Sequence, residues 1–230
     1  MQHSLFLIGF VIMSLAPLAI QATAARGAAT RTHTLLHATV PFVAATSYLA
    51  MALGVGTVLL PDGHLSYVAR YLDWSLTTPL LLAGLVLTAV GDERRFAQLG
   101  GYLSAVLSLD VLMIVAGLIS SLATSDAVKW AFYGWSCAAF VGVLYLLWVP
   151  LRTLAAERGD AIGHAYLANL SMLSVLWLLY PVVFLVGPEG VGSIGGGATV
   201  LAILVLDVLA KVAYAFVAAF NLDRALPKEA

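Results

Sequence analysis

The chain of 230 residues has little charge and almost no cysteine. Only 10% of its residues are charged, 62% are hydrophobic, and its mean hydropathy is +0.99, which lies outside the range of ordinary water-soluble domains. A net charge of −1 gives no basic surface, so nucleic acid is excluded as a partner. The single cysteine, Cys137, can form no disulfide within the chain. This composition indicates an integral membrane bundle.

Motifs of hydrolytic and transfer enzymes are also missing from the sequence. It contains no glycine-rich phosphate loop, no nucleophile elbow, no internal repeat and no histidine spacing of a metal site. The histidines at positions 3, 33, 64 and 164 are expected in loops or at helix ends. We therefore expect neither an enzyme nor a metal protein.

Long apolar runs are what the sequence has in abundance. A run of about 20 apolar residues is long enough to cross a bilayer as a helix. Seven such runs cover residues 3–24, 34–59, 67–90, 97–123, 128–152, 163–187 and 198–222. The first run also ends in "ATA", which would fit a signal-peptide cleavage site, but we interpret it as a helix. The predicted fold is an all-α membrane protein, a seven-transmembrane-helix bundle with residues 1–230 in a single domain.

The basic residues predict the orientation of this bundle. Eight of the eleven follow odd-numbered spans: Arg26, Arg31, Arg94, Arg95, Arg152, Arg158, Arg224 and Lys228. The positive-inside rule places that side in the cytoplasm. We expect an extracellular N-terminus, a cytoplasmic C-terminus and a multi-pass location in a cell membrane, the inner membrane of a prokaryote.

Four ionisable residues fall inside the expected spans: Arg70 and Asp73 in the third, Asp207 and Lys211 in the seventh. Each such group costs at least a few kcal/mol in a bilayer, which makes it a functional candidate. Asp207 and Lys211 lie one helical turn apart on one face, as do Asp73 and Thr77. A lysine joined to an aldehyde as a protonated Schiff base would keep its charge beside two carboxylates. With Arg70 the charges would then sum to zero; the alternative is two structural ion pairs.

Two long motifs around these residues carry a family resemblance. "ARYLDWSLTTPLLL" and "LDVLAKV" closely resemble the third-helix and seventh-helix signatures of the microbial rhodopsins, in particular light-driven proton pumps of the bacteriorhodopsin type. "TSYLAM", "LDVLMIVAGL" and "WLLYPVVFLVGPEG" extend the resemblance over spans two to seven. The resemblance implies all-trans retinal covalently bound to Lys211, protons as the transported ion, a membrane-lipid environment and a homo-oligomer, either trimer or pentamer.

The resemblance also implies a role for each polar residue near Lys211. Asp73 would be the primary counterion and proton acceptor, hydrogen-bonded by Thr77. Asp207 would be the second counterion and would accept a hydrogen bond from Tyr48. Arg70 would lie just extracellular to both carboxylates and couple their charge to proton release.

A retinal pocket is implied by the same resemblance. Trp74 and Trp177 would enclose the polyene, although an aromatic residue taken alone is more often ordinary core. Asp110 would be protonated and hydrogen-bonded to Thr78. Leucine at position 81 implies green rather than blue absorption. The other pocket residues implied are Tyr180, Leu81, Met113 and Phe184.

The cytoplasmic half departs from the best-known pumps. Three motif positions read Asp73, Thr77 and Gly84, resembling the rhodopsins known by an Asp-Thr-Gly motif, and glycine replaces a carboxylic proton donor. The missing donor has three possible explanations. The Schiff base is reprotonated slowly and directly from the cytoplasm, the protein is a slow-cycling sensor, or another helix supplies the donor. We favour His37, because it precedes Tyr48 by the same eleven residues that separate Gly84 from Asp73 on an antiparallel span. The alternative is a histidine that only hydrogen-bonds the backbone.

The extracellular side, where the proton leaves, also differs from the best-known pumps. Glu189 matches one member of a glutamate pair used for proton release, but Thr199 occupies the partner position. We therefore expect release late in the cycle or through water near Arg70 and Glu189. The predicted function is a light-driven outward proton pump without a carboxylic cytoplasmic donor. The alternatives are a photosensory rhodopsin that signals to a separate transducer, and a seven-helix transporter or receptor without chromophore.

Overall fold

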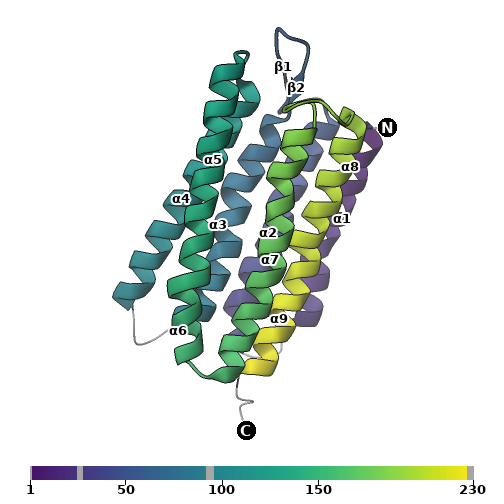
Figure 1. The fold of residues 1–230 in the computed structure, drawn as a ribbon. Coiled ribbons are helices and arrows are strands. Elements are labelled where there is room, and N and C mark those ends of the chain that lie inside the picture. Colours follow the sequence, from purple (N-terminus) through teal and green to yellow (C-terminus); the bar gives the residue numbers. More distant parts are fainter. Residues whose placement is uncertain (1, 25–27, 92–95, 227–230) are drawn as a thin grey trace.

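The computed structural model describes residues 2–24, 28–91 and 96–226, which form a bundle of long helices (Figure 1). Two π-helical turns, Leu147–Leu151 and Val208–Ala213, join α5 to α6 and α8 to α9. Seven spans result, each long and apolar enough to cross a bilayer, so the predicted all-α architecture is confirmed. The helices are α1 (Gln2–Ala24), α2 (Ala28–Ala52), α3 (Val68–Val90), α4 (Phe96–Leu122), α5 (Asp126–Leu146), α6 (Arg152–Glu157), α7 (Asp160–Val186), α8 (Gly196–Asp207) and α9 (Tyr214–Ala225).

The first apolar run forms α1, which packs into the bundle. Its side chains Phe6 and Met13 are buried in a cluster with Tyr48 and Met51 of α2. Ile20, further along the same helix, is also fully buried. Burial of these large apolar side chains stabilises the helix within the bundle.

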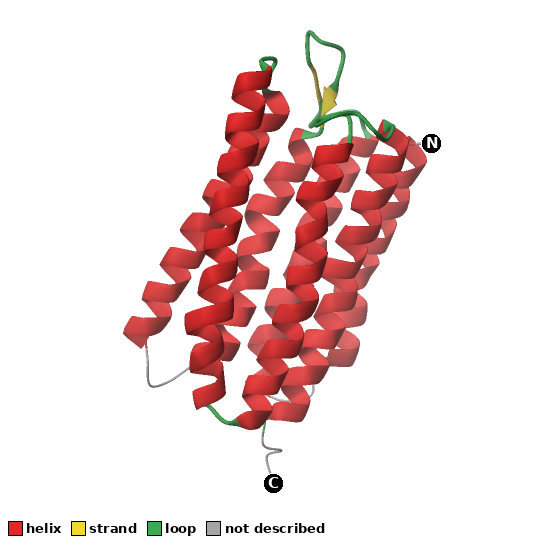
Figure 2. Ribbon diagram, viewed as in Figure 1, coloured by secondary structure: helices red, strands yellow, loops and turns green. Residues whose placement is uncertain are grey.

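The second span ends earlier than the apolar run predicts. Residues 53–59 were expected in the helix, but α2 ends at Ala52 and the chain forms a hairpin of β1 (Val58–Leu59) and β2 (Leu65–Ser66). Gly54 and Gly56 adopt φ values of +74° and +75°, a left-handed conformation that glycine reaches without strain and that stops a helix. The hairpin stands at the N-terminal end of the bundle, above α3 (Figure 2).

The fifth span is longer than predicted and reaches Glu157. Pro150 lies inside its π-helical turn, where the missing N–H and the bulk of the proline ring are accommodated by a locally wider helix. The second π-helical turn contains Lys211. Such wide turns frequently occur at functional sites.

Four basic residues of the described chain lie at the end opposite the hairpin. Arg31 lies near the start of α2, Arg152 begins α6, Arg158 directly follows α6, and Arg224 lies near the end of α9 (Figure 1). Arg26, Arg94, Arg95 and Lys228 fall outside the described residues. The orientation across the membrane stays a prediction.

Candidate functional site

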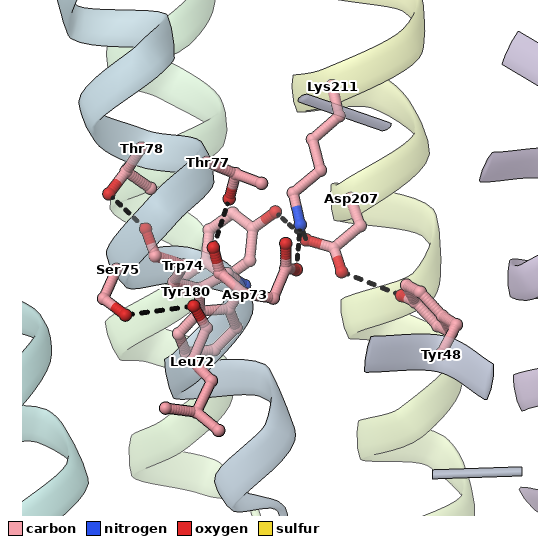
Figure 3. Close-up of polar contacts among 10 residues, drawn as sticks. All are labelled: Tyr48, Leu72, Asp73, Trp74, Ser75, Thr77, Thr78, Tyr180, Asp207 and Lys211. Atoms are coloured by element: carbon pink, nitrogen blue, oxygen red, sulfur yellow. Dashed lines mark hydrogen bonds and ion pairs between the residues drawn. The ribbon is translucent and has the colours of Figure 1, made fainter. Parts of the chain in front are cut away.

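Lys211 lies between two carboxylates in the middle of the bundle (Figure 3). Its Nζ donates a close hydrogen bond to Asp73 of α3 and lies 3.2 Å from Oδ1 of Asp207, one turn earlier on the same span. All three side chains are at most 2% exposed. Charges this deeply buried are costly unless they are paired and hydrogen-bonded, so the three groups stabilise one another only as a set.

The two carboxylates differ in how fully they are hydrogen-bonded. Tyr48 of α2 and Tyr180 of α7 each donate to Asp207, at 2.8 Å to Oδ2 and 2.8 Å to Oδ1. The Tyr48 contact agrees with the predicted one, whereas sequence reasoning assigned Tyr180 only to the apolar slot. Oδ1 of Asp73 has no hydrogen-bond partner among the described residues. Asp73 is therefore the carboxylate with a free oxygen.

Two threonines of α3 each hydrogen-bond the main-chain oxygen four residues earlier in the helix. Thr77 donates to the main-chain oxygen of Asp73 at 2.9 Å, so the predicted hydrogen bond reaches the backbone of that residue. Thr78 lies 2.7 Å from Oδ2 of Asp110 on α4 and 2.7 Å from the main-chain oxygen of Trp74. The predicted Thr78–Asp110 pair thus joins α3 to α4 behind the Lys211 site.

A cavity of about 120 Å³ opens beside Lys211. Six further residues that the resemblance assigned to the pocket line it, namely Trp74, Leu81, Met113, Trp177, Tyr180 and Phe184, with Thr78. Sequence reasoning missed the wall made by α5, which includes Tyr133, Ser136, Cys137 and Phe140. These α5 residues carry no motif, and their spacing is that of any packed helix.

The cavity fits a long apolar aldehyde. Aromatic and aliphatic side chains form most of its wall, and among the described residues the amine of Lys211 is the one amine that lines it. This is the donor set for a polyene bound covalently through a lysine. Tyr48 and Asp110 do not line the cavity. Asp110 pairs with Thr78, which does line it, and Tyr48 donates to Asp207, the neighbour of Lys211.

His37 and Gly84 face each other further along the bundle, toward the end away from the hairpin. A β-carbon on Gly84 would lie 3.3 Å from Cε1 and 3.4 Å from Nε2 of His37. The imidazole is 3% exposed, packs edge-to-face on Tyr214 at a ring-centroid distance of 5.5 Å, and its Nδ1 has no partner within the described chain. The two residues therefore lie at the same depth, as their spacing from Tyr48 and Asp73 predicts.

Glu189 lies in the turn after α7, at the hairpin end. Its Oε2 accepts a hydrogen bond of 3.2 Å from Tyr71, and its Oε1 has no partner in the part of the chain that the structure describes. Burial raises the pKa of the Glu189 carboxyl above its usual value, and the nearby Arg70 guanidinium opposes that rise. The Thr199 hydroxyl is directed to the main-chain oxygen of Gly195, at 3.3 Å.

Comparison with known proteins agrees with this geometry. The profile of the family described as bacteriorhodopsin-like protein matches residues 1–224. Archaerhodopsin-2 of Halobacterium sp. (strain aus-2) is 41% identical over 182 residues, covering 77% of this chain and 68% of that protein. The crystal structure of thermophilic rhodopsin from Rubrobacter xylanophilus is 37% identical, with a TM-score of 0.91 and coverage of 98% of this chain and 97% of that chain.

A second solved structure carries a functional name. The rhodopsin CsR of Coccomyxa subellipsoidea, described as a light-driven proton pump, is 32% identical, with a TM-score of 0.84 and coverage of 95% of this chain and 96% of that one. The family match spans all seven helices. The protein is a multi-pass membrane protein that belongs to the bacteriorhodopsin-like family of microbial rhodopsins.

Proposed function

We propose that this protein is a light-driven outward proton pump of the Asp-Thr-Gly subgroup, formed by residues 1–230 as a single retinal-binding domain. The observation that supports it most is the amine of Lys211 held between Asp73 and Asp207 beside an apolar cavity. The relationship to the Coccomyxa proton pump supports the same function. We place the protein in the inner membrane of a prokaryote, as a trimer or pentamer.

All-trans retinal, joined to Lys211, is the proposed chromophore. When bound, it supplies the absorption of visible light and an isomerisation that changes the position and basicity of the lysine nitrogen. Trp74 and Trp177 provide flat apolar walls, and Leu81 favours green absorption. The remaining contacts come from Met113 and Phe184.

Asp73 is the proposed proton acceptor. Asp207 already accepts hydrogen bonds from Tyr48 and Tyr180 and pairs with Lys211, so both of its oxygens are occupied. Asp73 contacts the same nitrogen and keeps one oxygen free. A proton leaving the Lys211 nitrogen therefore passes to Asp73.

His37 is the proposed cytoplasmic donor. Gly84 cannot hold a proton, and the His37 ring is the side chain that meets the space where a Gly84 side chain would lie. Its free Nδ1 leaves one ring nitrogen available for proton uptake. Glycine at position 84 thus gives the imidazole room to stand in the proton path.

The proposed function is tested by illuminating an unbuffered suspension of cells that express the protein with retinal. Outward pumping predicts acidification of the medium, because each cycle exports a proton, and a protonophore should abolish the signal. Illuminated cells without retinal serve as the control. A visible absorption band without any pH change would contradict pumping and support a photosensor.

The donor role of His37 is tested with His37→Ala. The return of a proton to the Lys211 nitrogen, followed as recovery of absorbance after a flash, should slow by about 10² or more and become pH-dependent, because the proton then comes from bulk water. Added imidazole should restore the rate by entering the space left by the ring. His164→Ala, at an exposed position of α7, is the control. Fast, pH-independent recovery in His37→Ala would exclude the donor role.

A further inference from the structure

The path from Glu189 to the surface is the part of proton export that the site leaves open. Glu189 contacts Tyr71, and Arg70 lies near it. Thr199, where a second carboxylate would be expected, has no acid group and is directed to Gly195. A proton at Glu189 therefore needs an exit other than a carboxylate pair.

A line of hydroxyl groups begins at Glu189. Tyr71 donates to Oε2 of Glu189 at 3.2 Å, and the Ser121 hydroxyl of α4 lies next to the Tyr71 hydroxyl. Ser121 in turn forms a close hydrogen bond with Ser66 of β2. Both serines are fully buried. A hydroxyl both donates and accepts, so each member of this line can pass a proton to the next.

Two features of α4 and the hairpin hold this line together. The Tyr71 ring packs over Gly117, one turn before Ser121, where a β-carbon would be in ordinary contact with Tyr71 Cε1 at 3.4 Å. On the hairpin, Nε2 of His64 lies 3.0 Å from the main-chain oxygen of Ser121. The histidine thus fastens the hairpin to the end of α4, directly beside the paired serines.

His64 also contacts a partly exposed carboxylate at the surface. Its Nδ1 lies 2.6 Å from Oδ1 of Asp62, whose side chain is 41% exposed. The two ring nitrogens face a main-chain oxygen and a carboxylate oxygen, so the His64 ring bridges the end of α4 and Asp62. The main-chain N–H of His64 also donates to Asp62 at 3.2 Å and holds the pKa of that carboxyl below its usual value. The partly exposed Asp62 carboxyl and the His64 ring therefore lie where the buried hydroxyls approach solvent.

We propose that protons leave Glu189 beneath the α2–α3 hairpin, along the hydroxyls of Tyr71, Ser121 and Ser66, and reach solvent beside the His64–Asp62 pair. The O–H bond at Glu189 breaks, each hydroxyl passes one proton outward as it accepts another, and the last proton joins solvent. The line is left unchanged in composition. His64 is a positioning residue that keeps Ser66 against Ser121. This inference rests on the proposed pump function.

The test is flash-induced proton release from the retinal-bound protein, followed with a soluble pH-indicator dye. Ser121→Ala breaks the line and should delay release by about tenfold or more, because a positioned proton-transfer group is lost. The visible band should stay in place, because Ser121 is absent from the cavity wall. Ser120→Ala is the matched control, since the neighbouring Ser120 is equally buried but donates to the main-chain oxygen of Lys129 at 2.9 Å.

The outcomes distinguish failure of the exit route from failure of the proposed pump function. If the unaltered protein releases no proton, the pump proposal fails. If it releases protons and Ser121→Ala does so equally fast, the exit route is overturned while pumping stands. Should Ser121→Ala form no pigment, His64→Gln decides, because it removes the ring that bridges Asp62 and the main-chain oxygen of Ser121. Delayed release supports the route, and unchanged release overturns it.

Discussion

Replacing Asp73 with asparagine is expected to abolish light-driven proton export while leaving a visible pigment. Asparagine keeps the volume of the side chain but accepts no proton from the Lys211 nitrogen. Asp207 cannot substitute, because Tyr48, Tyr180 and Lys211 already occupy its oxygens. We expect the initial rate of light-induced acidification to fall by at least about 10², the usual contribution of a positioned proton-transfer group.

Two further variants show whether the loss comes from the carboxylate. Asp73→Glu restores an acid group at the same position and should recover part of the transport rate. Asp126→Asn makes the same chemical change at a side chain that is 88% exposed, and should leave transport intact. Acidification by Asp73→Asn at the rate of the unaltered protein would remove Asp73 from the acceptor role.

The fold could be predicted from hydropathy because a bilayer fixes the length of each helix and requires every backbone group in it to be hydrogen-bonded. The ends of the helices were predicted less accurately. Residues 53–59 are as apolar as a helix, and only the positive φ angles of Gly54 and Gly56 turn them into the hairpin. Hydropathy depends only on the side chains and therefore does not detect a change in backbone conformation.

Contacts in the site could be predicted wherever both residues lie on one helix. Asp207 and Lys211 are one turn apart, so their proximity follows from helix geometry. Opposition of His37 and Gly84 followed from counting depth along antiparallel spans. Contacts between helices, such as Tyr48 with Asp207, could be expected only through resemblance to a known family.

The contacts that escaped prediction join segments far apart in the chain and carry no motif. The Ser66–Ser121 pair links the hairpin to α4, and serines at these positions look like ordinary helix-end residues. Arg158, taken from the sequence only as an orientation marker, donates to the main-chain oxygen of Thr88 at 2.6 Å and closes the end of α3. Such pairings depend on how neighbouring helices pack, which periodicity within one helix does not determine.

Lys211→Ala is expected to form no visible pigment when retinal is added. Lys211 is the one lysine that lines the cavity, and alanine provides no amine for covalent attachment. The measurement is the visible absorption spectrum after retinal is added to the purified protein. Lys129→Ala, near the start of α5, removes a lysine whose Nζ lies 3.9 Å from Asp126, and should leave the spectrum unchanged.

The same substitution should also destabilise the retinal-free protein, because it leaves Asp73 and Asp207 buried without their shared cation. Removing one partner of a buried ion pair typically costs about 3–5 kcal/mol. Adding Asp73→Asn to Lys211→Ala should recover much of that loss, since the carboxylate that lost its partner becomes neutral. Thermal unfolding of the two retinal-free variants and the retinal-free parent measures this difference. A pigment in Lys211→Ala would mean that another group holds retinal, and equal stability of all three proteins would show that Lys211 and Asp73 do not act as an ion pair.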